Sequence, residues 1–428
     1  MFERPDIGQR AILVHVIFNG AANNQELGEF KDLVRSTGAE IATIITVQRS
    51  MPDAKLLIGS GKVEEIGSLA HSLDADIVIF NYSLSPSQER NLEKICEKRV
   101  LDRTGLILDI FAQRARSYEG KLQVELAQLK YLSTRLVRGW SHLERQKGGI
   151  GLRGPGEKQL ESDRRMLRLR IKQLSKRLEK LRKQRDQGRA ARRKTTTPTV
   201  ALVGYTNAGK STLFNRLTDA SVYSADKLFA TLDPTLRQMQ IAKGQHIVLA
   251  DTVGFIQDLP HDLIEAFHAT LLETQEADVL LHVVDASDPH RDNNVEQVQG
   301  VLEQIDALDV PQIMVYNKID QINMLPSVDL DIHGRIQNIW VSAITGDGQD
   351  LLVQALRQYF EHKVKHVWLQ LPPKAGGLRS ELYSNNAVIS ESVDEQGNWV
   401  IEAEVPINML KKFTEYQIPE ESGQRASI

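Results

Sequence analysis

The stretch TVALVGYTNAGKSTLFNRL, Thr199–Leu217, places a glycine-rich turn between an apolar run and an amphipathic segment. The turn runs from Gly204 to Ser211 with the spacing G-x-x-x-x-G-K-S. Backbone N–H groups in such a turn curl around phosphate oxygens, and the positive end of the following helix adds attraction. The Lys210 ammonium can reach the β- and γ-phosphates, and the Ser211 hydroxyl can bind Mg²⁺. The stretch therefore predicts a strand, a phosphate loop and a helix in an α/β domain with a mainly parallel sheet.

Three later motifs indicate which nucleotide this loop holds. DTVG at Asp251–Gly254 follows the run HIVLA, NKID at Asn317–Asp320 follows IMVY, and SAI begins at Ser342. The Asp320 carboxylate can accept both N1–H and the exocyclic amino group of guanine, and backbone of the SAI motif can meet O6. Adenine lacks this donor pair and would leave the carboxylate poorly satisfied. In this order, the motifs predict GTP or GDP together with Mg²⁺.

A threonine that binds the metal is expected between the phosphate loop and DTVG. LFATLDPTLR offers two: Thr231 is favoured as a Mg²⁺ ligand beside Ser211, and Thr235 is the alternative. Such a threonine is ordered by Mg²⁺ and the γ-phosphate and is released after hydrolysis. Three residues are expected to act in catalysis: Lys210 because it reaches the β- and γ-phosphates, Thr231 because it binds Mg²⁺, and Gly254 because its N–H can sense the γ-phosphate. The residues predicted to contact the nucleotide are Gly204, Tyr205, Thr206, Asn207, Ala208, Gly209, Lys210, Ser211, Thr212, Phe229, Ala230, Thr231, Leu232, Asp233, Asp251, Thr252, Val253, Gly254, Asn317, Lys318, Ile319, Asp320, Ser342, Ala343 and Ile344.

A strongly basic segment lies just before this domain. The formal net charge of the chain is −3, yet residues 158–194 hold 16 basic and 4 acidic residues, a local net of +12. Apolar residues from Leu167 to Leu181 repeat at spacings of 4, 3, 4 and 3, and a similar leucine stripe covers 122–143. Two helices with one narrow apolar seam each, separated by a glycine-rich breaker, predict a long antiparallel helical hairpin.

The breaker GGIGLRGPGEK, residues 148–158, contains a lysine but does not qualify as a second phosphate loop. No strand pattern precedes it, and no Ser or Thr follows its lysine. It is predicted to form the tip of the hairpin, at the end of an arm of roughly 40 Å for about 28 residues. Basic residues near this tip, among them Arg135, Arg153 and Arg165, suit contact with folded RNA. A basic coiled coil that is only solvated is the alternative.

Two smaller domains flank these parts. Residues 10–110 alternate Val- and Ile-rich runs with helical patterns, one opening at Ser85 with Pro86, which predicts a mainly parallel sheet covered by helices. Leu378–Pro406 is expected to form two strands around a Gln-Gly-Asn turn, with a helix following at INMLKKFTEY. The predicted domains are an N-terminal α/β domain at 1–113, the hairpin at 114–196, the GTP-binding domain at 197–363 and a small α+β domain at 364–428.

Composition excludes several protein classes. The sequence contains no run of 18 apolar residues, so no transmembrane helix is expected. The N-terminus lacks the apolar core of a signal peptide. A single cysteine, Cys96, excludes an internal disulfide and a cysteine-based zinc site and suits a reducing cytoplasm. Cys96 occupies an apolar helical position and is expected to pack in a core.

The combined motifs resemble the HflX family of translation-factor-related GTPases. The phosphate loop, Thr231 and the DTVG, NKID and SA motifs match the five guanine-nucleotide motifs, and GGIGLRGPGEKQLESDRR looks like the family signature. The resemblance covers nearly the whole chain. It implies a cytoplasmic GTPase that binds the large ribosomal subunit and its ribosomal RNA near the peptidyl-transferase centre and splits ribosomes, notably under stress. We expect it to act as a monomer.

One departure and three alternatives accompany this resemblance. Phe255 stands where Ras-type enzymes have a water-orienting glutamine, so slow intrinsic hydrolysis, stimulated by ribosomes, is expected. A GTP-regulated protein that binds or unwinds RNA is the alternative function. The resemblance also raises ATP binding in the N-terminal domain, with Gly59–Lys62 as the candidate loop. Association of the basic hairpin with anionic membrane is the weakest alternative.

Overall fold

The computed structural model describes residues 8–18, 24–139, 155–194, 197–218, 228–242, 245–256, 271, 273–331, 334, 336–361, 364–384 and 387–419. The chain divides into two compact units. Unit 1 comprises residues 1–182, 224–233 and 256–271, and unit 2 comprises 183–223, 234–255 and 272–428. Within the described part of the chain, no helix is both long and apolar enough to cross a membrane.

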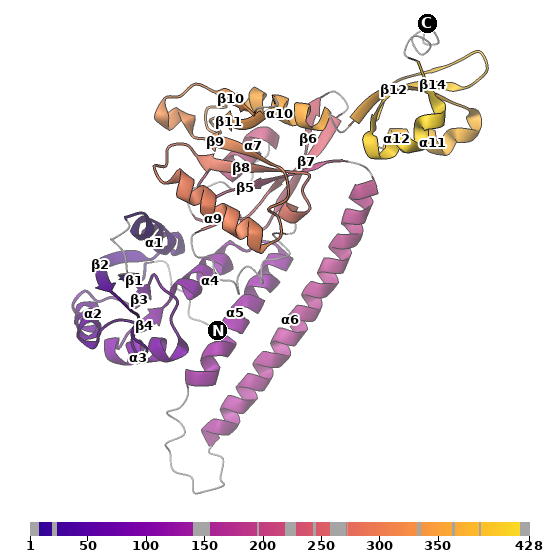
Figure 1. The fold of residues 1–428 in the computed structure, drawn as a ribbon. Coiled ribbons are helices and arrows are strands. Elements are labelled where there is room, and N and C mark those ends of the chain that lie inside the picture. The colour runs from indigo at the N-terminus through magenta and orange to yellow at the C-terminus, as the bar shows by residue number, and fades with distance from the viewer. Residues whose placement is uncertain are drawn as a thin grey trace. The chain divides into compact units, whose positions relative to one another are not determined.

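The N-terminal part of unit 1 is a parallel four-stranded sheet covered by helices (Figure 1). The strands lie in the order β2-β1-β3-β4, and a capping box at Ser85 with Pro86 in the first turn starts α3, as predicted. Cys96 is fully buried in the core, also as predicted, and burial raises the pKa of its thiol to about 11. The elements are β1 (Arg10–Phe18), α1 (Asn24–Thr37), β2 (Glu40–Arg49), α2 (Ser60–Ser72), β3 (Ile77–Phe80), α3 (Pro86–Cys96), β4 (Arg99–Leu101) and α4 (Arg103–Arg114).

The predicted hairpin consists of α5 (Tyr118–Gly139) and α6 (Pro155–Lys194), which run in opposite directions (Figure 1). Leu122, Leu126 and Leu174 form a small buried seam, and further leucines and an isoleucine pack at its edges. An ion pair between Arg170 and Glu125 links the helices at 2.6 Å. Residues 148–154 of the predicted tip, which include Arg153, lie outside the described residues. Residues 155–158, predicted as part of the tip, form the first turn of α6 instead.

Arg135 does not belong to the exposed basic tip, so that prediction was wrong. Its guanidinium donates to Glu89 at 2.7 Å and to the buried Asp102 at 2.9 Å, and it stacks over the Tyr131 ring. Tyr131 also donates to Asp102, at 2.6 Å. Burial raises the pKa of Glu89 to about 6, against the opposing effect of Arg135. This network, which we call the Asp102 cluster (Glu89, Asp102, Tyr131 and Arg135), fastens α5 to α3 and to the start of α4.

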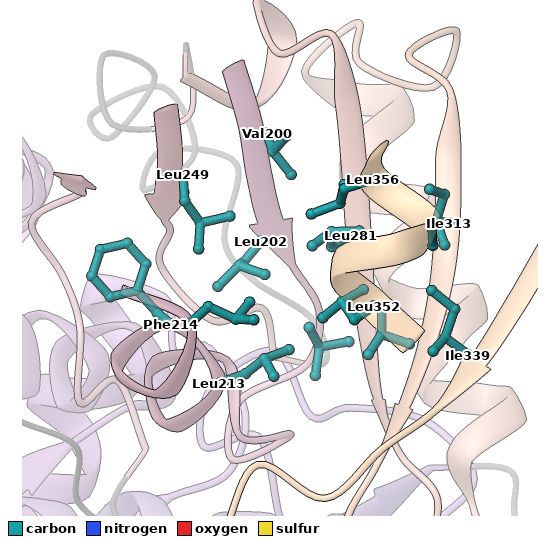
Figure 2. Packing of buried hydrophobic residues seen from close by; sticks show 14 of the residues in the cluster. Val200, Leu202, Leu213, Phe214, Leu249, Leu281, Ile313, Ile339, Leu352 and Leu356 are labelled. Atoms are coloured by element: carbon teal, nitrogen blue, oxygen red, sulfur yellow. The ribbon is translucent and has the colours of Figure 1, made fainter. Parts of the chain in front are cut away.

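The second α/β domain, in unit 2, is a seven-stranded sheet in the order β10-β11-β9-β8-β5-β7-β6. Its central strands are parallel, whereas β6 and β10 pair antiparallel with their neighbours. Figure 2 shows Leu202, Leu249 and Leu281 of the sheet packed with helix residues such as Phe214. The elements are β5 (Thr199–Val203), α7 (Lys210–Thr218), β6 (Thr235–Ala242), β7 (Gln245–Asp251), β8 (Val279–Asp285), α9 (Arg291–Gln304), β9 (Gln312–Asn317), β10 (Ser327–Leu330), β11 (Ile336–Trp340) and α10 (Gln349–Glu361).

The C-terminal module is an antiparallel sheet in the order β13-β14-β12-β15. The predicted turn is present: Asp394 accepts from the N–H groups of Gln396 and Asn398, and Gly397 has φ of 80°. The stretch predicted as two strands also contains a helix, Gly376–Ser384, because Leu382 packs into the core of the module. The elements are β12 (Val364–Leu371), α11 (Gly376–Ser384), β13 (Val388–Val393), β14 (Trp399–Pro406), α12 (Ile407–Phe413) and β15 (Gln417–Ile418). The predicted α/β fold class, with hairpin and small α+β domain, is confirmed.

Candidate functional site

The phosphate loop joins β5 to α7 and needs glycine at both of its signature positions. Gly204 has φ of 148°, and a side chain there would collide with the Val283 carbonyl oxygen. Gly209 has φ of 92°, and a side chain there would collide with the amide of Asn317. Asn207 between them adopts a left-handed conformation with φ of 61°. The glycines thus allow the tight turn and the close approach to Val283 and Asn317 that this loop needs.

Lys210 is buried at the start of α7. Its ammonium donates to the carbonyl oxygens of Gly204 at 3.0 Å and Tyr205 at 2.6 Å. Burial lowers the pKa of Lys210 to about 8, and Asp251 partly opposes this shift. A buried cation enclosed by the loop is the group expected to neutralise phosphate charge.

The lowered pKa of Lys210 predicts that nucleotide binding takes up a proton at mildly alkaline pH. Phosphate oxygens favour the charged ammonium and raise its pKa, so a lysine that is half neutral at pH 8 must gain a proton. We expect uptake of about 0.5 proton at pH 8 and about 0.1 at pH 7, with GTP affinity decreasing above pH 8. Calorimetry of GDP binding in HEPES and in Tris, at both pH values, measures this uptake. Equal uptake at the two pH values would contradict it.

The arrangement around Ser211 fits a hard divalent cation. The Ser211 hydroxyl donates to a carboxylate oxygen of Asp251 at 2.7 Å, and Asp251, at the end of β7, is fully buried. Mg²⁺ prefers oxygen ligands of this kind and holds water as its remaining ligands. The Thr206 hydroxyl, buried nearby in the loop, has no hydrogen-bond partner among the described residues. These oxygens fit the predicted Mg²⁺, with Ser211 as direct ligand and Asp251 acting through water.

Gly254 and Phe255 lie against the phosphate loop. A side chain at position 254 would come within 2.8 Å of the Thr206 methyl and 3.0 Å of the Lys210 ammonium, so only glycine fits there. Phe255 forms a parallel bridge with the loop: its N–H donates to Gly204 at 3.2 Å, and its carbonyl accepts from Thr206 at 2.7 Å. The Phe255 ring is fully buried. Phe255 therefore positions the loop through its backbone and offers no side chain to a water molecule.

The NKID motif contacts the phosphate loop directly, and the SAI motif is joined to the loop through Asn317. The Asn317 amide donates to the Ala208 carbonyl and accepts from the Ala343 N–H, both at 2.9 Å. Asp320 accepts from the Ser342 hydroxyl at 2.5 Å. Ile319 and Ala343 are buried and Ile344 is exposed. One asparagine thus connects the three segments predicted to hold the phosphates and the guanine.

A further residue, Asp285, was not identified from the sequence. It ends β8, where it binds the Lys318 ammonium at 2.7 Å and also accepts from the Ser287 hydroxyl. Lys318 has a left-handed backbone with φ of 67°. The signal was present, because Asp285 ends the apolar run VLLHVV at the same edge of the sheet as the other motifs.

The predicted switch residues lie in unit 1. Phe229, Thr231 and Leu232 are buried, and the Asp233 carboxylate binds Arg116 and Ser117. Their contact with nucleotide remains a prediction.

Comparisons with known proteins identify the family. Three family models match: GTP-binding GTPase N-terminal at 24–112, GTP-binding GTPase Middle Region at 114–192 and 50S ribosome-binding GTPase at 199–318. The GTPase HflX of Escherichia coli strain K12 is 55% identical over 408 residues, which cover 95% of this chain and 96% of the relative. The chain belongs to the HflX family of GTPases. It binds guanine nucleotide and hydrolyses GTP to GDP and phosphate.

A second curated relative supports the same family. The GTPase HflX of Caldanaerobacter subterraneus is 44% identical over 410 residues, which cover 96% of this chain and 94% of the relative. A solved structure described as the complex of SsGBP and GDP has 25% identity and a TM-score of 0.48, covering 82% of this chain and 98% of that one.

Proposed function

We propose that this HflX-family GTPase binds the large ribosomal subunit and splits or rescues ribosomes in the stressed cytoplasm. Mg²⁺ held by Ser211, with Thr231 as a second ligand, would neutralise charge on the β- and γ-phosphates. Lys210 and the Gly254 N–H would face the transferred phosphoryl group. The other residues of the phosphate loop and of the DTVG, NKID and SAI motifs would enclose the remainder of the nucleotide.

The observation that carries the ribosomal part is the basic face of α6. Arg165, Arg168, Lys172, Lys176 and Lys180 are all exposed. At 100° per residue, all of them except Arg168 lie on the side of α6 away from the seam residues Ile171, Leu174 and Leu178, and Arg168 lies at the flank of the seam. The positions from 165 to 180 extend over about 22 Å at 1.5 Å per residue. A row of this length suits the phosphates of folded RNA, and a family model matching the GTP-binding domain is described as a 50S ribosome-binding GTPase.

Slow intrinsic hydrolysis follows from the position of Phe255. A buried ring cannot orient the attacking water, and that role must come from another group. Contact with the ribosome is proposed to supply or order this group.

Ribosomes should therefore raise the GTP turnover of this protein by roughly tenfold or more. The triple variant Arg165→Ala, Arg168→Ala, Lys172→Ala should keep its basal rate and lose most of the stimulation, because it loses phosphate contacts. Phosphate release measured with and without 70S ribosomes, at two salt concentrations, tests this. Lys365→Ala, Lys374→Ala, Lys411→Ala removes three exposed charges from the C-terminal module and is the matched control.

Sedimentation of 70S ribosomes with GTP, GDP or a non-hydrolysable analogue tests splitting in the same samples. Turnover that ribosomes leave unchanged would reject the proposal. Stimulation without dissociation of subunits would favour the alternative, a GTP-regulated RNA-binding or unwinding protein. ATP binding at Gly59–Lys62 is not proposed: Lys62 pairs with Glu65 at 2.8 Å, and the comparisons lend ATP no support.

A further inference from the structure

The hydroxyl of Thr206, in the phosphate loop, is a buried polar group without a hydrogen bond. Thr206 is 7% exposed, and its Oγ1 has no hydrogen-bond partner among the residues that the structure describes. Burying a hydroxyl in this way is costly, and most buried hydroxyls in folded proteins do have a partner. Inside a phosphate loop, this hydroxyl therefore indicates a contact that forms when the nucleotide binds.

Thr206 differs in this respect from its neighbours between the two glycines of the loop. Tyr205 is partly buried, Asn207 is exposed and Ala208 is apolar. Thr206 is thus the residue of this stretch that combines full burial with a polar side chain.

The backbone of Phe255 holds Thr206 in position. The Thr206 N–H donates to the Phe255 carbonyl at 2.7 Å, and the Phe255 N–H donates to the Gly204 carbonyl at 3.2 Å. Because the backbone donor of Thr206 is already engaged, its hydroxyl is the donor that this residue can offer to a phosphate oxygen. Phe255, whose ring cannot orient water, thus fixes a residue whose side chain can.

The Thr206 side chain lies beside the two groups expected to face the transferred phosphoryl group. A side chain at position 254 would come within 2.8 Å of the Thr206 methyl and 3.0 Å of the Lys210 ammonium. Gly254, Thr206 and Lys210 therefore surround one small space, and all three belong to unit 2. If Lys210 and the Gly254 N–H contact the γ-phosphate, the Thr206 hydroxyl is placed to reach the same phosphoryl group.

We propose that the Thr206 hydroxyl is a catalytic group of GTP hydrolysis: it accepts a hydrogen bond from the attacking water and donates its own hydrogen to a γ-phosphate oxygen. A hydroxyl can do both at once, whereas a phenyl ring can do neither. Water then adds to the γ-phosphorus while the bond to the β–γ bridging oxygen breaks, and one water proton goes to the released phosphate. Thr206 itself is unchanged at the end of the reaction.

This inference rests on the proposed placement of the γ-phosphate at Lys210 and Gly254. It names the group that orients water where Ras-type enzymes use glutamine. Contact with the ribosome would then order a group that the chain already carries.

Thr206→Val tests the hydroxyl alone, because valine keeps the β-branched shape and the methyl group beside Gly254. We expect kcat for GTP to fall by about ten- to a hundredfold, the range for loss of a hydrogen bond to a charged group. The affinity for GDP and the Mg²⁺ concentration that gives half-maximal rate should stay close to the wild-type values, because the hydroxyl contacts neither the β-phosphate nor the metal. Single-turnover phosphate release and calorimetry of GDP binding measure these quantities. Thr414→Val, at an exposed threonine of the C-terminal module, is the matched control and should change none of them.

Thr206→Ser keeps the hydroxyl and should keep most of the wild-type kcat, whereas Thr206→Ala should lose it as valine does. This pair repeats the comparison with smaller side chains, so the test remains valid if valine disturbs the loop. Wild-type kcat in Thr206→Val and Thr206→Ala, or an equal loss in Thr206→Ser, would overturn the inference. A GDP affinity that falls as far as kcat, or a raised Mg²⁺ requirement, would also overturn it, because the hydroxyl would then support the loop or the metal.

Lys210→Ala separates this inference from the proposed function. If Lys210→Ala leaves kcat unaltered, the γ-phosphate does not lie at Lys210, and the proposed site fails together with the role of Thr206. If Lys210→Ala is slow while Thr206→Val keeps the wild-type kcat, only the role of Thr206 is rejected.

Discussion

Lys210→Ala is expected to reduce kcat/KM for GTP by roughly 10²- to 10³-fold, because it removes the buried cation that neutralises phosphate charge. Lys210 is enclosed by the phosphate loop, and its ammonium binds two loop carbonyls. If the protein splits ribosomes by using GTP, the variant also loses splitting. Phosphate release and ribosome sedimentation measure the two effects. Retained remodelling of ribosomal RNA would support the alternative function.

This loss should not arise from unfolding. Burial lowers the pKa of Lys210 from 10.5 to about 8, so below pH 8 the folded protein bears a cost of about 3 kcal/mol for its charge, which disappears as pH rises toward 10.5. Alanine removes that cost, and the melting temperature at pH 7 should be no lower than in the wild type. Lys374→Ala, at an exposed lysine, is the control for both measurements. A sharply lowered melting temperature would mean that Lys210 supports the fold instead.

Asp320→Asn is expected to change the base preference of the site from guanine to xanthine. Asn loses one of the two acceptors for the guanine donor pair, and its NH₂ group then faces the guanine amino group, so GTP affinity should fall by about 10²- to 10³-fold. Xanthine carries a carbonyl in place of that amino group, which the asparagine NH₂ can satisfy. Binding of XTP should therefore become stronger than binding of GTP.

Competition between GTP, XTP and ATP in a fluorescence displacement assay measures this exchange. The Ser342 hydroxyl, which donates to Asp320 at 2.5 Å, can still donate to an asparagine carbonyl, so the loop should keep its shape. Asp309→Asn, at an exposed position, is the matched control. GTP preference that persists in Asp320→Asn would mean that another group selects the base.

The sequence by itself determined the phosphate loop, the motifs at the strand ends and the seam of the hairpin. These features are local: the positive φ of the turn favours glycine at 204 and 209, and leucines at spacings of 3 and 4 select one helix face. Ser85 with Pro86 likewise marks a helix start within a few residues. Such patterns can be interpreted without knowing which residues distant in sequence pack against them.

Only the tertiary structure decided the roles of residues whose partners lie far along the chain. Arg135 appeared to belong to a basic tip, yet Glu89 and Asp102, 46 and 33 residues away, hold it inside unit 1. Asp233 was predicted to contact the nucleotide, yet its carboxylate accepts from the backbone N–H of Ser117, 116 residues earlier. The physical reason is that a buried charge needs a charged or hydrogen-bonding partner. The packing of distant segments supplies that partner, and the linear order of residues does not specify it.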